Sequence, residues 1–340
     1  MKFGVIVYET TENIGDDIQS YAAMQFLPQI DYFIDREHMN TFQTENDEPV
    51  AVIMNGWYMH NKYNFPPSQI IYPYLTSMHI ATNDYHFHNS IRFLDGIGGD
   101  FLRTFAPVGA RDLHTVEVFK KMNIPAYFSG CLTLTLPKQK IIEKQKKYIC
   151  LVDLTPEVEK KIIETLNCSD IDIKIMTMER SKLRTDWEKN YTSKKNEIEN
   201  LLSIYQNAKC VITSRLHVSL PCLAMETPVL TIYNPKDPRF LGLTDYLNIV
   251  SPDDFLSNNY NFNFVNSTKN KTNHLEIKKT LTDQCNKYVE TAKKLDHIPK
   301  TLPYNVNQAH EWQLNLINKY NSYQSKVDAL IKLRNNINNI

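Results

Sequence analysis

The stretch from Cys210 to Tyr233 reads CVITSRLHVSLPCLAMETPVLTIY, and it decides the fold. Its apolar residues predict a buried strand at 210–212, a helix that runs to about Met225 and a second buried strand at 228–232. A strand, a helix and a strand in this order form the repeating unit of a parallel α/β sheet.

The turn between the first strand and the helix carries residues suited to a ligand site. Ser214 is suited to capping the N-terminus of the helix. Arg215 and His217 follow it with a fixed positive charge and a titratable imidazole. In open α/β sheets, ligands bind at the carboxyl ends of strands, where helix N-termini attract anions. The sequence therefore predicts an anion site here, and the structural alternative is a capped helix start with a surface histidine.

Length and charge limit the classes of protein to which the chain can belong. At 340 residues the chain is too long for one ordinary core, so two domains are expected. It has 38 basic and 38 acidic side chains, so no overall field attracts nucleic acid and no nucleic-acid partner is expected. No apolar run is long enough to span a membrane, and residues 1–8 are too few for the core of a signal peptide.

The cysteines indicate a reducing compartment. They are widely spaced, and several lie in apolar segments, which favours buried thiols over a disulfide or zinc framework. We therefore expect a cytoplasmic protein, and a peripheral position at the inner face of the membrane is compatible with this. His86 and His88 would share one face of a strand, but no third ligand has a clear spacing, so no metal site is expected.

Strand and helix patterns alternate along the chain. In the first half, strands are expected at 2–8, 50–54, 79–82, 105–108 and 126–128. In the second half, strands are expected at 148–152, 171–176, 210–212 and 228–232, with helices at 156–166 and 195–206. We infer an α/β protein of two Rossmann-like domains that face each other across a cleft, at 1–140 and 147–298. A helical extension at 299–340 would carry a long helix, from about residue 306 to residue 333, that packs across one or both domains.

Other strand ends and strand-to-helix junctions carry further candidates. As a structural residue, Arg111 would pair with a neighbouring acid or carbonyl. As a functional residue, it would bind a carboxylate or phosphate through its planar guanidinium. Gly15 would allow a ligand to approach the backbone closely, and Asp16 lies beside it. Asn55 and Gly56, at the end of another strand, would form either a sugar-contacting loop or a simple turn.

Four short motifs resemble the polysaccharide pyruvyl transferase family. They are Asn13 to Asp17, Gly109 to Asp112, Ser129 to Thr133, and Ser214 to His217 leading to Thr227 to Val229. The most specific is Arg-Leu-His after a buried strand. The resemblance implies a fold like that of GT-B glycosyltransferases. It also implies a reaction that moves pyruvate from phosphoenolpyruvate onto two hydroxyls of a sugar, with loss of phosphate and formation of a cyclic ketal. The product would belong to a cell-surface polysaccharide or its precursor.

The resemblance also implies roles for individual residues. Arg215 would stabilise the phosphate or an oxyanion, and His217 would act as general acid or base. The expected donor-binding residues are Arg111, Ser214, Leu216 and Arg239. The expected acceptor-binding residues, on the opposite domain, are Asn13, Gly15, Asp16, Asn55 and Gly56. The partners would be phosphoenolpyruvate and a sugar or lipid-linked glycan, with no cofactor and no metal, because arginines can neutralise the charge.

Two other functions remain open at this point. One is a GT-B-type glycosyltransferase that uses a nucleotide sugar, although no convincing acidic pair for a ribose follows a strand of the second domain. The other is a non-catalytic glycan-binding subunit of an assembly. The intact Arg-Leu-His motif argues against this second alternative.

Overall fold

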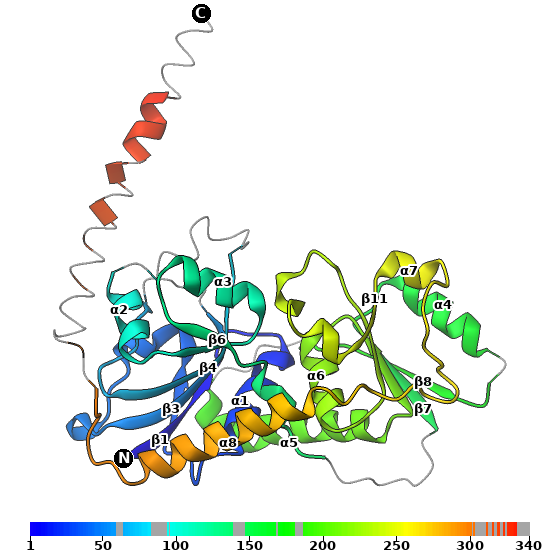
Figure 1. Ribbon diagram of the computed structural model, residues 1–340, viewed down its shortest axis with the longest axis horizontal. Coiled ribbons are helices and arrows are strands. Elements are labelled where there is room, and N and C mark those ends of the chain that lie inside the picture. The colour runs from blue at the N-terminus through cyan, green and yellow to red at the C-terminus, as the bar shows by residue number, and fades with distance from the viewer. Residues whose placement is uncertain are drawn as a thin grey trace, which may run out of the picture.

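The structure is a computed structural model that describes residues 1–58, 64–82, 94, 96–138, 147–167, 169–180, 186–300, 302, 311, 315, 318–319, 322–323 and 325–331. It contains two parallel β-sheets, one of six strands and one of five. Figure 1 shows them side by side and flanked by helices, as a first lobe and a second lobe. The predicted fold class, α/β with two Rossmann-like units, is confirmed by this arrangement.

The first lobe is built on a sheet with the strand order β2-β1-β3-β4-β5-β6. Its strands are β1 (Lys2–Val7), β2 (Tyr32–Asp35), β3 (Val50–Tyr58), β4 (Ile71–Ile80), β5 (Val108–Ala110) and β6 (Ala126–Phe128). Its helices are α1 (Ile14–Met24), α2 (Ile97–Thr104) and α3 (Leu113–Lys121), and its 3₁₀ turns include η1 (Arg36–Thr41), η2 (Glu45–Asp47) and η5 (Leu132–Thr135). The strand order reverses at β1, because β2 and β3 pair with it on opposite sides.

The second lobe is built on a sheet with the strand order β11-β10-β9-β7-β8. Its strands are β7 (Tyr148–Val152), β8 (Asp172–Met176), β9 (Cys210–Thr213), β10 (Val229–Ile232) and β11 (Asn248–Val250). The helices that follow β7 in the chain are α4 (Pro156–Leu166), α5 (Trp187–Asn207), α6 (Leu216–Ala224), α7 (Pro252–Leu256) and α8 (Leu275–Ala292), with 3₁₀ turns η6 (Pro238–Phe240) and η7 (Thr244–Tyr246). Here the order reverses at β7, which pairs with β8 on one side and β9 on the other.

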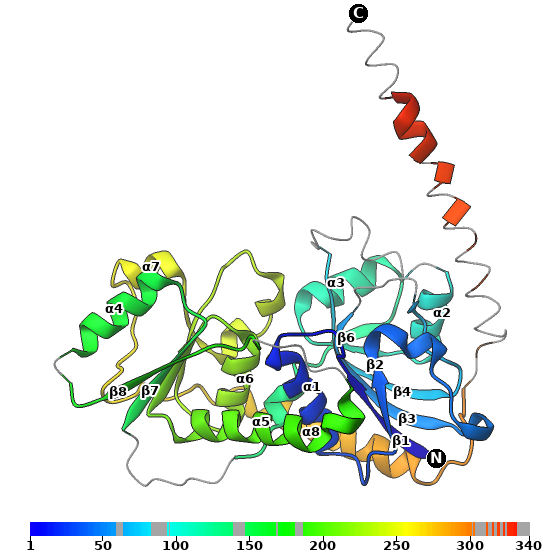
Figure 2. The same ribbon diagram turned by 180° about the vertical axis from the view of Figure 1, so that it is seen from behind.

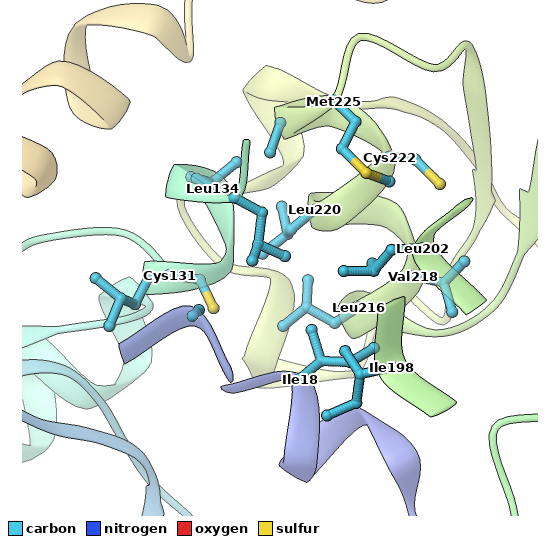
Figure 3. Packing of buried hydrophobic residues seen from close by; sticks show 14 of the residues in the cluster. Ile18, Cys131, Leu134, Ile198, Leu202, Leu216, Val218, Leu220, Cys222 and Met225 are labelled. Atoms are coloured by element: carbon cyan, nitrogen blue, oxygen red, sulfur yellow. The ribbon is translucent and has the colours of Figure 1, made fainter. Parts of the chain in front are cut away.

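One apolar layer belongs to both lobes. Helix α1 and turn η5 of the first lobe pack against α5 and α6 of the second, and their buried side chains form one continuous cluster. Figure 3 shows side chains from these elements meeting there, among them Ile18, Leu134 and Leu220. The cluster also includes Val5 and Val152, which belong to the two different sheets. The lobes are therefore joined through a shared hydrophobic core rather than through a polar hinge.

Helix α8 spans the same junction. The Tyr288 hydroxyl donates to the carbonyl of Tyr72 (2.6 Å) and accepts from the amide of Val52 (2.8 Å), both in the first sheet. Near the other end of the helix, Lys278 Nζ donates to the carbonyl of Ala224 at the end of α6 (2.9 Å). Figures 1 and 2 show α8 running along the lower edge of the molecule. Although α8 lies within the segment 147–298, it packs against the first lobe as well as the second.

Main-chain hydrogen bonds also cross between the lobes. The amide of Ile14 donates to the carbonyl of Met178 (2.8 Å), and the amide of Arg180 donates to the carbonyl of Glu12 (2.9 Å). This short antiparallel bridge fixes the loop after β1 against the loop after β8. The two loops that border the interface therefore hold a defined separation.

A buried group of charges lies beside this bridge. Asp17 of α1 forms ion pairs with Arg180 and with Lys194 of α5, whose Nζ lies 3.6 Å from the carboxylate. The side chains of Asp17 and Lys194 are both 0% exposed. Lys194 Nζ also lies 4.6 Å from the centre of the Trp187 ring. Arg180 also pairs with Glu197 (2.9 Å), so Asp17 is shared by two cations of the second lobe, of which Arg180 has a second acidic partner.

Most predicted elements are found, and the differences have physical reasons. The strands at 126–128 and 148–152 and the helix at 156–166 are present as expected. Strand β4 ends close to the predicted position but begins already at Ile71. The sequence did not predict this first part, because Pro73 inside it argues against a strand. Helix α5 likewise begins earlier than predicted, at Trp187.

The predicted C-terminal helix falls largely outside the described residues. Residues 325–331 are helical, and Figure 1 shows this segment projecting away from both lobes. Val327, Leu330 and Ile331 are exposed there. The expectation that this helix packs across the lobes is therefore wrong for the part that is described, and α8 takes that place.

The cysteines that the structure describes are buried thiols, as their apolar surroundings in the sequence predict. Five cysteines are free and buried, namely Cys131, Cys150, Cys210, Cys222 and Cys285, and Cys168 lies outside the described residues. Within the described ranges, no helix has the length and apolar character needed to cross a membrane.

The buried charge group leads to a stability prediction. Replacing Asp17 by alanine is expected to lower the free energy of unfolding by about 3–5 kcal/mol, because the buried Lys194 loses its ion-pair partner and Arg180 keeps only Glu197. Urea unfolding followed by tryptophan fluorescence measures this loss. The control is Asp283→Ala, which removes an exposed pair with Lys279 and should cost less than about 1 kcal/mol. Equal losses in the two variants would contradict the prediction.

Candidate active site

The reversal points of the two sheets face each other across the junction of the lobes. The loop after β1 leads into α1 and carries Asn13, Gly15 and Asp16. The loop after β9 leads into α6 and carries Arg215 and His217. Ligands of open parallel sheets bind outside the carboxyl ends of strands at such reversals. The fold therefore brings both predicted motifs to the position where a ligand is expected.

The first turn of α6 presents free backbone donors. Arg215 occupies the N-cap position but makes no side-chain capping bond. The amides of Leu216 and His217 donate to no acceptor in the described part of the chain. Unpaired amides at a helix N-terminus attract anions. The expected capping by Ser214 is wrong, because its hydroxyl instead donates to the carbonyl of Asp153.

Pro221 explains the shape of this turn. It lies inside α6 and lacks the N–H that would bond the carbonyl four residues earlier, which is that of His217. His217 accordingly leaves the helical region, with φ −83° and ψ 18°. This bridge conformation is frequent among active-site residues. The sequence therefore sets the orientation of His217 through a proline one turn further along the helix.

A small pocket lies between the two loops, and we call it the arginine pocket. It is partly open to solvent, and its cavity volume is about 30 Å³. Its lining residues are Asn13, Arg111, Met178, Arg215, Leu216, His217 and Arg239. All but Met178 were singled out from the sequence.

Arg111 is the most deeply buried cation of the pocket, with 1% of its surface exposed. It follows β5, and its Nη1 donates to Oε1 of Gln19 (3.0 Å) and approaches Nε2 of His217 (3.3 Å). Its Nε lies 3.8 Å from Asp112 but makes no hydrogen bond in the described chain. The hydrogen-bond partners of Arg111 in the described chain are thus neutral, while Asp112 supplies a buried counter-charge without a hydrogen bond.

The other two arginines of the pocket are already paired with acids. Arg215 donates to Asp153 (2.9 Å) and to Glu179 (2.7 Å), and its side chain is 34% exposed. Arg239 makes a two-pronged contact with Asp237, which raises the pKa of Arg239. An anion in the pocket would have to share or replace these carboxylates.

His217 connects the two lobes at the pocket. Burial, together with the charges of Arg111 and Arg239, holds the pKa of His217 well below its usual range. Arg111 is a donor at every relevant pH, so Nε2 of His217 accepts and the ring proton resides on Nδ1. The imidazole is therefore neutral at pH 7. Gly15 allows this approach, since a Cβ at position 15 would lie 3.1 Å from the Cβ of His217.

The predicted acceptor residues separate into two groups. Asn13 lines the arginine pocket, and Gly15 and Asp16 lie in the first turn of α1 beside it. Asn55 instead donates from its side chain to the carbonyl of Gln19 (3.0 Å) and is buried. Gly56 packs against Tyr8, whose hydroxyl would be 1.8 Å from a Cβ at position 56. Neither Asn55 nor Gly56 lines the pocket. Asn55 instead contacts the backbone of Gln19, and Gly56 packs against Tyr8.

Three residues near the pocket were not identified as site residues from the sequence. Gln19 joins Arg111 to Asp16, because its Nε2 donates to the Asp16 carboxylate (3.1 Å) while its Oε1 accepts from Arg111. His79 and Asp112 form a buried pair next to Arg111. The only signal for them was position, since each lies close to the carboxyl end of a strand or at the start of the helix after it.

Metal ligation has no support in the described part of the chain. Within it, no group of three or more histidine, cysteine, aspartate or glutamate side chains is arranged to hold a metal ion. The pair His86 and His88 lies outside the described residues.

Comparison with known proteins identifies the class of the chain. The family model described as polysaccharide pyruvyl transferase matches residues 13–236. The match begins at the loop after β1 and ends beyond β10, so it contains both loops that border the arginine pocket. The chain belongs to the polysaccharide pyruvyl transferase family. Membership implies a transferase with a role in polysaccharide metabolism.

Solved structures show weaker similarity. The Escherichia coli heptosyltransferase WaaC with ADP is similar at 13% sequence identity and a TM-score of 0.31, over 71% of this chain and 90% of that chain. Accessory secretory proteins 1, 2 and 3 of Streptococcus pneumoniae are similar at 9% identity and a TM-score of 0.36, over 90% of this chain and 58% of that chain. No curated protein matches the chain.

The electrostatics of the pocket lead to a second prediction. Replacing Arg111 by methionine is expected to raise the pKa of His217, because a neighbouring cation disfavours the protonated ring. The rise should be partial, since burial, the larger cause, is unchanged. NMR titration of labelled histidine measures it, with His217→Gln used to assign the resonance. Arg103→Met, an exposed arginine paired with Asp100, should leave the titration unchanged, and an equal change in both variants would contradict the prediction.

Proposed function

We propose that the chain transfers pyruvate from phosphoenolpyruvate to two hydroxyls of a sugar and forms a cyclic ketal with release of phosphate. The observation that carries the proposal is the arginine pocket. It gathers Arg111, Arg215, Arg239 and the N-terminus of α6 around a small space between the lobes. The acceptor would be a sugar of a polysaccharide or of its lipid-linked precursor.

Phosphoenolpyruvate suits this pocket because it carries two anionic groups on three carbon atoms. One group would bind the free amides of Leu216 and His217, where the helix N-terminus favours negative charge. The other would bind Arg111, whose guanidinium has no carboxylate as a hydrogen-bond partner in the described chain. Arg215 and Arg239 would turn from Glu179 and Asp237 toward the phosphate as it leaves.

His217 is the proposed proton donor to the methylene carbon of phosphoenolpyruvate. In the free protein its ring is neutral, and Nε2 accepts from Arg111. A bound anion would raise the pKa of His217 and draw Arg111 toward itself, so that Nε2 can take up a proton. Transfer of this proton turns the methylene into a methyl group and leaves the adjacent carbon electron-poor. That carbon is then attacked by the sugar hydroxyl.

Asn13 and Asp16 are the proposed contacts to the acceptor. Both belong to the loop and first turn that face α6 across the pocket. The Asp16 carboxylate is oriented by Thr11 (2.7 Å) and Gln19 (3.1 Å). A carboxylate and an amide beside the donor suit the hydroxyls of a sugar, which both donate and accept hydrogen bonds.

The proposal is tested by product analysis. With phosphoenolpyruvate and a panel of acceptor glycosides, the protein is expected to release phosphate only when a suitable acceptor is present. Mass spectrometry should then find an acceptor heavier by pyruvate less one water. Thermal stabilisation by nucleotide sugars but not by phosphoenolpyruvate would instead favour a glycosyltransferase. Glycan binding without any phosphate release would favour an assembly subunit.

The role of His217 is tested separately. His217→Ala is expected to lower kcat by ~10²–10³ with the fold intact, as is typical when one transition-state contact is removed. Steady-state phosphate release and the melting temperature measure the two effects. His38→Ala is the matched control, because the side chain of His38 is 66% exposed and lies outside the pocket. Full activity of His217→Ala would exclude the assignment.

A further inference from the structure

A second histidine, His79, is built into a buried acid–imidazole pair beside the arginine pocket. Its Nδ1 lies 2.6 Å from Oδ2 of Asp112, and the two side chains are 2% and 0% exposed. The other oxygen of Asp112 accepts from the amide and the hydroxyl of Thr115, both at 2.8 Å. Asp112 is thus the N-cap of α3, and its position is fixed by the helix.

The pair lies next to Arg111, whose Nε is 3.8 Å from the Asp112 carboxylate. The amide of Arg111 donates to the carbonyl of Met78 (2.8 Å), the residue before His79. Asp112 follows Arg111, and the amide of Leu113 donates to the carbonyl of Leu241 (2.9 Å) in the loop after Arg239. The backbone therefore ties the pair to two arginines of the pocket.

The hydrogen bonds determine which nitrogen of His79 is free. Asp112 is expected to be ionised, because His79 and Arg111 hold its pKa below the usual value although burial acts to raise it. A carboxylate only accepts, so Nδ1 of His79 carries the ring proton. Its Nε2 then presents a lone pair. Nε2 has no hydrogen-bond partner in the described chain, yet it is not among the fully enclosed atoms without a partner.

The two histidines near the pocket therefore differ in whether their Nε2 atom already has a hydrogen-bond donor. Nε2 of His217 is occupied by a donor, Arg111. Nε2 of His79 is an unoccupied acceptor on a ring that an acid orients, which is the arrangement of a general base.

We propose that His79 is the general base that takes the proton from the attacking hydroxyl of the acceptor, and that Asp112 is the positioning residue that orients it. The inference rests on the proposed pyruvyl transfer.

The proposed steps balance. His217 gives one proton to the methylene carbon, and the first hydroxyl bonds to the neighbouring carbon as its proton passes to His79. The second hydroxyl then bonds to the same carbon while the carbon–oxygen bond to phosphate breaks. Of the two hydroxyl protons, one leaves with phosphate and one restores the proton that His217 gave. No oxidant or reductant is required.

The variant His79→Gln separates catalysis from donor binding. We expect kcat to fall by ~10²–10⁴, the usual contribution of a general base. Thermal stabilisation by phosphoenolpyruvate should stay as in the wild type, because the glutamine leaves Arg111 and the N-terminus of α6 in place. His114→Gln is the matched control, since the ring centre of His114 lies 6.4 Å from that of His79 and its Nε2 pairs with Thr82. It should retain wild-type kcat.

The pH dependence supplies a readout that a structural role would not change. In the wild type, kcat at saturating donor should fall toward acid pH, where Nε2 of His79 becomes protonated. Burial lowers the pKa of His79, and Asp112 partly offsets this, so Asp112→Asn should lower kcat and move the acid limb to still lower pH. Among the described residues, the other charged or titratable groups near His79 are Arg111, Arg239, Asp237, His217 and His114.

The outcomes are distinct. If the wild type converts no acceptor, the proposed function fails. If the wild type is active and folded His79→Gln keeps more than half of its kcat, or loses donor binding in proportion to kcat, only the role of His79 is overturned. If His79→Gln does not fold, the acid limb of the wild type and its shift in Asp112→Asn decide. A wild-type profile without an acid limb overturns the role of His79.

Discussion

The packing of α1 and η5 against α5 and α6 is the contact on which the rest of the structure depends. It merges the inner faces of two sheets into one apolar core. As a result, the carboxyl ends of β1 and β9 face each other at a fixed separation. The loops after these strands carry opposite walls of the arginine pocket. The site is therefore a product of inter-lobe packing, and neither lobe contains it alone.

Charge in this region is balanced in two different ways. At the buried bridge, Asp17 and Glu197 compensate Arg180 and Lys194 within the protein. In the arginine pocket, Arg215 and Arg239 have acidic partners at its rim, whereas Arg111 is held by Gln19 and His217. Asp112 is near Arg111 (3.8 Å) but accepts no hydrogen bond from it, so Arg111 can donate to a ligand without first breaking a hydrogen bond to a carboxylate. This difference separates the structural cations from the one best prepared for a substrate.

Periodicity predicted the strands at 148–152 and 210–212 because buried parallel strands are continuous apolar runs. Junction residues such as Arg111 and His217 were found because strand ends form the ligand edge of a sheet. Periodicity missed the first part of β4, where Pro73 interrupts the pattern. It also missed the pairing of His79 with Asp112, since partners 33 positions apart leave no local signal. Local pattern places residues at an edge, and only packing between elements assigns their partners.

The shared core also limits how such a chain can diversify. Because α1 and η5 of one lobe pack closely against α5 and α6 of the other, exchanging one lobe for that of a relative would leave the packed surfaces of the two lobes mismatched. New acceptor preferences would therefore arise more readily by substitution and insertion in the surface loops around the arginine pocket than by recombination of whole lobes. In evolutionary terms, two sheets that look like separate modules would be inherited as one.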